Sequence, residues 1–169
     1  GGIGSSMVRA FLAEDSKVAV HYGNQRDSAE KLATESEGRA KAFQADLTQE
    51  AEVERLFGDI ESELGPVECV IANAGIWPAE NVPIHEMTLT QWNKTLAVDL
   101  TSVFLTMRRF FIGIRNFELK DPSAVLIGST AAVFGEAGHV DYAAAKAGIS
   151  YGMLQTLKNE ISQLTRSGR

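Results

Sequence analysis

Residues 65–75 read Gly-Pro-Val-Glu-Cys-Val-Ile-Ala-Asn-Ala-Gly. The Gly-Pro pair ends the helical pattern before it. The run from Glu68 to Ala72 is apolar on both faces after its start, which is typical of a strand in a sheet covered on both sides. Asn73-Ala74-Gly75 then suits a tight turn and a close approach of the backbone to a ligand. This stretch therefore predicts an α/β fold with a parallel sheet.

The same alternation of short β-branched runs and longer amphipathic stretches continues on both sides. Strands are predicted at residues 17–22, 40–45, 68–72 and 124–128, and helices at 27–37, 49–64, 90–117 and 141–165. Strand–helix alternation with short connections indicates right-handed βαβ units. We therefore predict a doubly wound, Rossmann-like three-layer α/β/α fold in a single domain over residues 1–169.

Both ends of the sequence look cut. The sequence opens on Gly1-Gly2-Ile3-Gly4, a turn that leads into a helix, and the strand expected before this turn is missing. It ends at residues 166–169 directly after a helix, where another strand is expected. We therefore expect an internal piece of a longer protein, lacking the first and last strands of its sheet.

Composition excludes several classes of function. The net charge is −6, and no basic cluster is longer than Arg108-Arg109, so a nucleic-acid partner is not expected. The single cysteine, Cys69, lies in a predicted strand interior and indicates an inert thiol in a reducing compartment. No long apolar run or signal-like leader is present, which favours a cytoplasmic protein without a membrane partner. No metal site is expected, because metal-ligand spacing is absent from His21, His85 and His139.

The strongest chemical signal is Tyr142-Ala143-Ala144-Ala145-Lys146. On a helix, residues four apart lie on one face, so the phenol and the ammonium are expected to be neighbours. A nearby ammonium favours the phenolate form, which makes a tyrosine effective in acid–base transfer near neutral pH. Alone, the pair is a weak signal, because a core or surface tyrosine with a solvated lysine gives the same spacing.

Further candidates lie where predicted strands end and helices begin. Ser129 follows the strand that ends at Gly128, where open α/β sheets bind ligands, and its hydroxyl could polarise a substrate carbonyl. Alternatively, Ser129 only forms a Ser/Thr turn. Gly2-Ile3-Gly4 precedes an apolar helix whose first amides could meet a pyrophosphate. Asp46 could contact an adenine ring or cap the next helix.

In this order and spacing, these residues resemble the short-chain dehydrogenase/reductase family, in its compact single-domain branch, similar to 3-oxoacyl-carrier-protein reductases. The matches to its cofactor signatures are Gly2, Ile3, Gly4, Asp46, Leu47, Asn73, Ala74 and Gly75. The matches to its catalytic serine, tyrosine and lysine are Ser129, Tyr142 and Lys146.

The resemblance implies an NAD(P)(H)-dependent oxidoreductase that interconverts a small-molecule carbonyl and an alcohol. Tyr142 would transfer the proton, Lys146 would assist Tyr142 and bind the nicotinamide ribose, and Ser129 would polarise the carbonyl. It also implies a homo-oligomer, a dimer or tetramer, assembled through the long helix at 90–117 and the helix carrying Tyr142.

One catalytic position departs from the family pattern, and another region bears on the choice of cofactor. Val98-Asp99-Leu100 carries an aspartate where the family has an asparagine whose main chain supports a proton relay. The resemblance implies that Asp99 keeps this backbone role, so Asp99 is a fourth catalytic candidate. Its carboxylate would bring negative charge toward Lys146. Where NAD-binding members carry an acidic residue this chain has Tyr22, followed by Asn24 and Arg26, which favours NADP over NAD.

Two other functions remain open on the sequence. A non-catalytic dinucleotide-binding scaffold or redox sensor would bind cofactor without turnover. A sugar-nucleotide epimerase or dehydratase is compatible with reading residues 1–4 as Gly-x-x-Gly, although Asn73-Ala74-Gly75 and the spacing of Ser129 and Tyr142 favour the compact branch. Trp77-Pro78 could border a substrate pocket or pack against its own helix.

Overall fold

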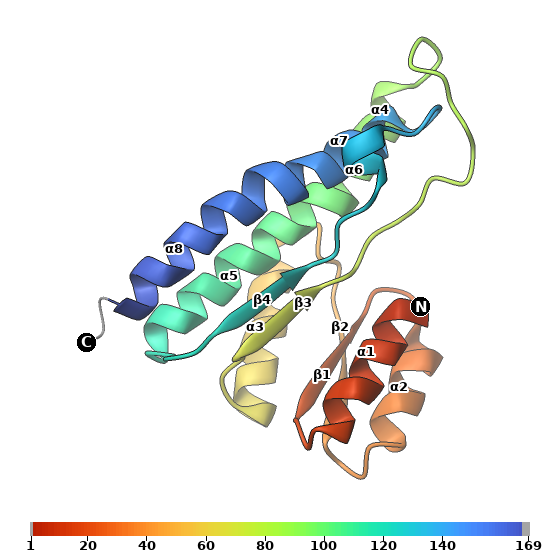
Figure 1. Ribbon diagram of the computed structural model, residues 1–169. Helices are drawn as coiled ribbons and strands as arrows, with labels where there is room; N and C mark the ends of the chain where they lie inside the picture. Colours follow the sequence, from red (N-terminus) through yellow and green to blue (C-terminus); the bar gives the residue numbers. More distant parts are fainter. Residues whose placement is uncertain (1, 167–169) are drawn as a thin grey trace. The chain divides into compact units, whose positions relative to one another are not determined.

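The computed structural model describes residues 2–166 and divides into two compact units, Gly1–Val67 and Glu68–Arg169 (Figure 1). Gly1 of the glycine motif and residues 167–169 of the predicted chain end lie outside the described residues. That the two units make one domain stays a prediction.

The first unit is built on two parallel strands, β1 (Val18–Tyr22) and β2 (Ala40–Gln44). Their register pairs Val18 with Ala40, and α2 (Arg26–Thr34) connects them. Before β1 lies α1 (Gly2–Ala13), and after β2 lies α3 (Glu50–Leu64). This order is the predicted βαβ unit.

Alternate residues of these strands face opposite helices. Val20 and Ala40 belong to one cluster with Ala29 and Leu32 of α2, against which residues of α1 also pack. Phe43 belongs to another cluster, with residues of α3. The strand pair is thus covered on both faces, which explains its β-branched and alanine-rich composition.

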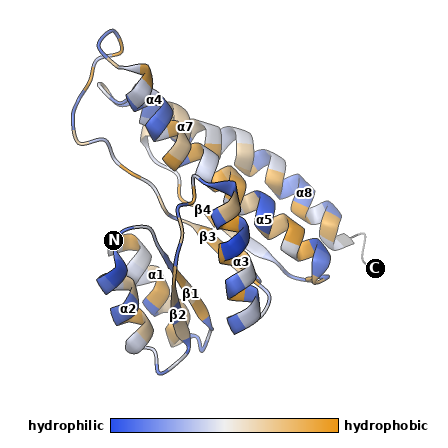
Figure 2. Ribbon diagram, turned by 180° about the vertical axis from the view of Figure 1, so that it is seen from behind, coloured by the Kyte–Doolittle hydropathy of each residue, from blue (hydrophilic) through white to orange (hydrophobic). Residues whose placement is uncertain are grey.

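Helix α3 shows how local sequence sets an element's limits. Its buried residues recur at helical spacing, and Figure 2 shows hydrophilic and hydrophobic residues along it. The helix ends at Gly65, whose φ of +99° lies in a region that side chains disfavour. Pro66 then prevents continuation. The buried residues are Val53, Leu56, Phe57 and Ile60.

The second unit carries the other parallel pair, β3 (Cys69–Ala72) and β4 (Ser123–Leu126). Between them the chain forms α4 (Leu89–Leu96), the π-helical turn η1 (Ala97–Thr101) and α5 (Ser102–Asn116). After β4 come α6 (Ala131–Phe134), α7 (Val140–Ala147), the π-helical turn η2 (Gly148–Met153) and α8 (Leu154–Arg166). In Figure 1, α5 and α8 lie side by side.

The core of this unit is centred on α5. The helix packs on β3 and buries one face, whose largest members are Met107, Phe110 and Ile114. The helix predicted at 90–117 is therefore present, but the wider turn of η1 interrupts it. The helix predicted at 141–165 is likewise divided by η2, and α6 was not predicted. Among residues 2–166, no helix combines the length and the apolar character needed to cross a bilayer.

Candidate active site

The turn after β3 lies against a buried carboxyl group. Asn73 N–H donates to the carbonyl of Ile71 at 3.0 Å, which turns the chain at the end of the strand. A Cβ atom at Gly75 would lie 2.3 Å from Asp99 Oδ1 and 3.4 Å from Lys146 Nζ. Glycine therefore lets the β3 turn, η1 and α7 meet at one point.

Asp99, in η1, is fully buried. Its Oδ1 accepts a hydrogen bond from Ile76 N–H at 2.9 Å, whereas Oδ2 has no hydrogen-bond partner within the described part of the chain. Burial raises the pKa of the Asp99 carboxyl, and the charge of Asp141 acts in the same direction. The Ile76 N–H and the Lys146 ammonium oppose that rise. Asp99 therefore holds its proton more tightly than an exposed aspartate does.

Lys146 lies in the last turn of α7 and is only 5% exposed. Its ammonium donates to the carbonyl of Ile127 at 3.3 Å and lies 3.8 Å from Asp99 Oδ1. The same nitrogen is 5.6 Å from the centroid of the Tyr142 ring. The ammonium is therefore held beside the phenol, as the spacing of four residues leads one to expect.

The start of α7 is anchored by Asp141, which is fully buried. Its Oδ1 accepts from the backbone N–H of Tyr142 at 2.8 Å, and its Oδ2 accepts from Thr95 Oγ1 at 2.7 Å. Thr95 lies on α4, so this carboxylate connects the two helices and sets the position of the Tyr142 backbone. Sequence reasoning missed this role, because nothing local links residues 46 positions apart.

Ser129 lies between β4 and α6, two residues after the carbonyl that binds Lys146. Its Oγ accepts from Ala131 N–H at 3.2 Å, as in a Ser/Thr turn, and its own O–H remains available as a donor. Within residues 2–166, no hydrogen bond joins Ser129 to Tyr142. The serine thus follows the strand end as expected, and the turn and the polarising role are chemically compatible.

Aromatic rings enclose one side of Tyr142. The Trp77 and Tyr142 rings meet edge to face, with centroids 4.8 Å apart. The Trp77 indole also stacks on His139, with centroids 4.1 Å apart and an interplanar angle of 16°. From the sequence, Trp77 could either border a substrate pocket or pack against its own helix, and His139 had no predicted role. The structure places both beside the candidate acid–base residue.

In the first unit, the predicted phosphate-binding residues lie in the first turn of α1. Gly2, Ile3 and Gly4 open that helix, no acidic residue occurs in its first turn, and the space beside Gly2 is free of other atoms. Exposed amides at the positive end of a helix dipole suit an anion such as a phosphate.

Asp46 and Leu47 follow β2. Asp46 Oδ1 accepts from both the N–H and the Oγ1 of Thr48, at 2.9 and 2.7 Å, and these bonds lower the pKa of the Asp46 carboxyl. Leu47 packs against the cluster that contains Phe43. The N-cap residue of α3 is Gln49, so Asp46 stabilises the turn before the helix and is not its cap.

The candidates for cofactor discrimination lie after β1. Tyr22 ends that strand and packs against the cluster around Val20. Asn24 and Arg26 border a cavity of about 220 Å³. Arg26 Nε donates to Glu30 Oε1 at 2.6 Å, and this bond raises the pKa of the guanidinium. A cation is therefore present at the start of α2, already paired with a carboxylate of the same helix.

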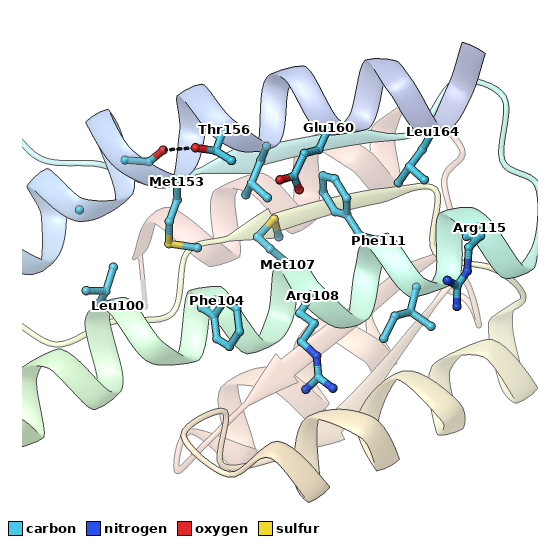
Figure 3. Close-up of a pocket in the computed structure, with 14 residues that line it drawn as sticks. Leu100, Phe104, Met107, Arg108, Phe111, Arg115, Met153, Thr156, Glu160 and Leu164 are labelled. Atoms are coloured by element: carbon cyan, nitrogen blue, oxygen red, sulfur yellow. Dashed lines mark hydrogen bonds between the residues drawn. The ribbon is translucent and has the colours of Figure 1, made fainter. Parts of the chain in front are cut away.

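A separate groove of about 800 Å³ runs between α5 and the segment formed by η2 and α8 (Figure 3). Phe104 and Met107 of α5 line it opposite Met153 and Leu164. Phe104 is half-exposed, so the groove presents apolar surface to its surroundings.

Comparison with known proteins identifies the family. The chain matches the family model described as short chain dehydrogenase over residues 1–165. The chain belongs to the short-chain dehydrogenase family. The predicted Rossmann-like α/β fold with parallel strands is thereby confirmed. Members of this family bind NAD(P), act on small molecules and commonly form oligomers.

Two of the named relatives are reductases. Similarity extends to a Mycobacterium tuberculosis (strain ATCC 25618 / H37Rv) protein, (5R,7aS)-5-hydroxy-7a-methyl-1-oxo-2,3,5,6,7,7a-hexahydro-1H-indene-carboxyl-CoA reductase, at 31% identity, covering 88% of this chain and 56% of the relative. Two proteins of Rhizobium meliloti (strain 1021) are also similar. Acetoacetyl-CoA reductase is 31% identical over 94% of this chain and 63% of the relative. Nodulation protein G is 32% identical over 96% of this chain and 64% of the relative. The chain thus spans less than two-thirds of each relative.

Proposed function

We propose that the protein is an NAD(P)(H)-dependent oxidoreductase that interconverts a carbonyl and an alcohol. The observation that carries this proposal is the buried Lys146 ammonium, held between the Ile127 carbonyl and Asp99 beside the Tyr142 ring. A lysine buried at this depth is rare without a partner or a role. The reductases among the relatives, acetoacetyl-CoA reductase included, support the same reaction class.

In the direction of reduction, the Tyr142 hydroxyl donates a proton to the carbonyl oxygen. The Lys146 ammonium favours the phenolate that remains, and the Ser129 hydroxyl donates a hydrogen bond to the same oxygen. A bound nicotinamide would supply the hydride, so that one carbonyl, one reduced cofactor and one proton would give one alcohol and one oxidised cofactor. Tyr142 regains its proton from solvent, and in the reverse direction it accepts the alcohol proton.

The residues of the chain fit such a cofactor. In the first unit, the amides of Gly2, Ile3 and Gly4 at the start of α1 suit its phosphates. In the second unit, the Lys146 donors that do not bind the Ile127 carbonyl suit the hydroxyls of the nicotinamide ribose. We also propose backbone contacts to the cofactor from the turn formed by Asn73, Ala74 and Gly75 after β3. Asp46 and Leu47 complete the proposed cofactor residues.

We further propose NADP as the preferred cofactor, with NAD as the alternative. Tyr22 offers no carboxylate to repel a 2′-phosphate, and Asn24 and Arg26 border the cavity that follows β1. Arg26 would exchange its bond with Glu30 for the phosphate, because a dianion attracts a guanidinium more strongly than one carboxylate does. The ratio of kcat/KM for NADPH and NADH tests this preference.

The proposal also covers the substrate, the location and the oligomeric state of the enzyme. We expect a small-molecule carbonyl or alcohol as substrate, a cytoplasmic location, and a homodimer or homotetramer. The apolar groove between α5 and α8 is the candidate contact surface between copies. Phe104→Glu should lower the molecular mass measured by light scattering, and an unchanged mass would reject this surface.

The test of the reaction is a panel of carbonyl substrates with NADPH and NADH, run on the parent protein, Tyr142→Phe and Tyr151→Phe. Tyr142→Phe should lose at least about 100-fold in kcat while it still binds the cofactor. Tyr151 is 57% exposed on η2, and its phenylalanine variant should retain full activity. Unchanged turnover in Tyr142→Phe would refute the mechanism, and cofactor binding without turnover in the parent protein would favour a scaffold or sensor.

A further inference from the structure

The indole of Trp77 remains 53% exposed although it contacts the Tyr142 ring. Large apolar side chains are usually buried, and those left exposed together often mark a binding surface. A carbonyl oxygen that reaches the Tyr142 hydroxyl brings its neighbouring substituents close to this indole. A substrate bound at Tyr142 would therefore pack against the exposed surface of this indole.

The indole is held from behind by His139, which is only 1% exposed. The imidazole Nε2 lies 2.9 Å from the Pro78 carbonyl oxygen, and Nδ1 lies 3.2 Å from that of Ala137. A neutral imidazole donates to one of these oxygens and an imidazolium to both. In either form the backbone orients the ring, and the stacked ring orients Trp77.

The segment that carries Trp77 is also held directly. Val82 N–H donates to the Gly138 carbonyl at 3.0 Å. A Cβ atom at Gly138 would lie 2.8 Å from Asn81 Cα, so the two backbones are in close contact. Residues 77–82 are therefore attached to the chain before α7 at both ends. A wall that is already ordered costs little entropy when a substrate packs on it.

We infer that Trp77 is a specificity-determining residue, and that the substrate carbonyl bears a flat, apolar substituent that packs on its indole. This inference rests on the proposed function and narrows its substrate class. Flat rings gain contact with an indole, whereas a charged substituent would lose water there without a polar partner. Val133 and Phe134 of α6, the helix after Ser129, are also exposed apolar side chains, which agrees with an apolar substrate.

The kinetic test compares acetophenone, a flat aryl ketone, with 2-butanone, a small linear ketone. Trp77→Ala should lower kcat/KM for acetophenone about tenfold, and for 2-butanone less than threefold, because only the aryl ring loses its stacking partner. Trp77→Phe should keep acetophenone within about threefold of the parent protein. The matched control is Trp92→Phe, which changes the other tryptophan, on α4, and should leave both ketones unaffected.

A binding measurement avoids dependence on turnover. Trp92→Phe leaves Trp77 as the only tryptophan of the chain, so its fluorescence reports on that residue alone. Acetophenone should quench it along a saturable curve, and should quench Trp77→Phe, which retains Trp92, without saturation. The folding of each variant is checked by circular dichroism.

The outcomes separate the two proposals. If turnover persists and Trp77→Ala changes both ketones equally, the inference is wrong and the proposed function stands. If no variant reduces either ketone but quenching saturates, Trp77 binds the ring and the proposed reaction is in doubt. If acetophenone quenches the Trp92→Phe variant without saturation, the proposed role of Trp77 is wrong, whether or not the ketones are reduced.

Discussion

Gly75→Ala should disrupt the candidate site through one atomic overlap. The new Cβ would lie 2.3 Å from Asp99 Oδ1, so one of the two atoms must move by about 1 Å to reach ordinary contact. Asp99 is fully buried, and the displacement would break its bond with Ile76 N–H. Overpacking costs about 1–3 kcal/mol, and the lost hydrogen bond about 0.5–1.5 kcal/mol more. We expect the unfolding free energy to fall by roughly 2–4 kcal/mol.

In Gly75→Ala, kcat should fall even under conditions where the variant stays folded, because a displaced Asp99 would also displace the neighbouring Lys146. A displacement of about 1 Å in a catalytic group costs on the order of 100-fold in rate. Urea unfolding followed by circular dichroism gives the free energy, and initial rates give kcat. Gly58→Ala is the matched control, because its added Cβ would meet no described atom within 4 Å beyond the nearby backbone of α3 itself. Alanine there should stabilise α3 by about 0.5–1 kcal/mol.

A double variant isolates the overlap itself. Combining Gly75→Ala with Asp99→Ala removes the atom that the new Cβ meets. The double variant should therefore be destabilised by at least about 1 kcal/mol less than the sum of the two single variants. Additive costs would show that Asp99 is not the obstacle. An unfolding free energy within about 0.5 kcal/mol of the parent, with kcat unchanged, would refute the reasoning altogether.

Three further variants test other parts of the structure. Asp99→Asn should retain or raise kcat, and a tenfold loss would show that the carboxylate itself is needed. The pKa of Asp99 is raised in the folded state, so ionisation of this carboxyl lowers the unfolding free energy as the pH rises above 3.8. Asparagine does not ionise, so urea titrations at several pH values should show a smaller decrease in the unfolding free energy for Asp99→Asn. Gly138→Ala should lower the unfolding free energy by about 1–3 kcal/mol, since its φ is +80° and its Cβ would meet Asn81; an unchanged melting temperature would contradict this. Arg26→Ala should raise KM for NADPH about tenfold with little effect on NADH, and equal changes would argue against 2′-phosphate recognition.

The strands could be predicted from sequence because their signals are local. All four lie within two residues of the predicted ranges, since short β-branched runs between turn residues specify strands without distant partners. The long helices were located correctly, but their interruptions were not. The residues of η1, Ala-Val-Asp-Leu-Thr, include no glycine or proline, so nothing in their composition signals a wider helical turn.

In the candidate site, too, the contacts within one helix could be predicted from the sequence, whereas the contacts between distant residues could not. Tyr142 and Lys146 are four residues apart on one helix, so their proximity follows from helical geometry. The contacts of Asp141 with Thr95 and of His139 with Trp77 join residues far apart in sequence. Those contacts depend on how the loops before α4 and α7 are packed, which no periodicity encodes.

The two strand pairs also differ in how much chain each must close. The β1–β2 pair joins residue 18 to residue 40, whereas the β3–β4 pair joins residue 69 to residue 123. The second loop is about 2.5 times longer, which adds about 0.8 kcal/mol of closure entropy before any contact is gained. We therefore expect β1–β2 to pair earlier during folding, and its amide hydrogens to become protected first in pulse-labelled exchange. On the ribosome, where the N-terminal part emerges first, this order would leave the strands around the acid–base residues to be completed last.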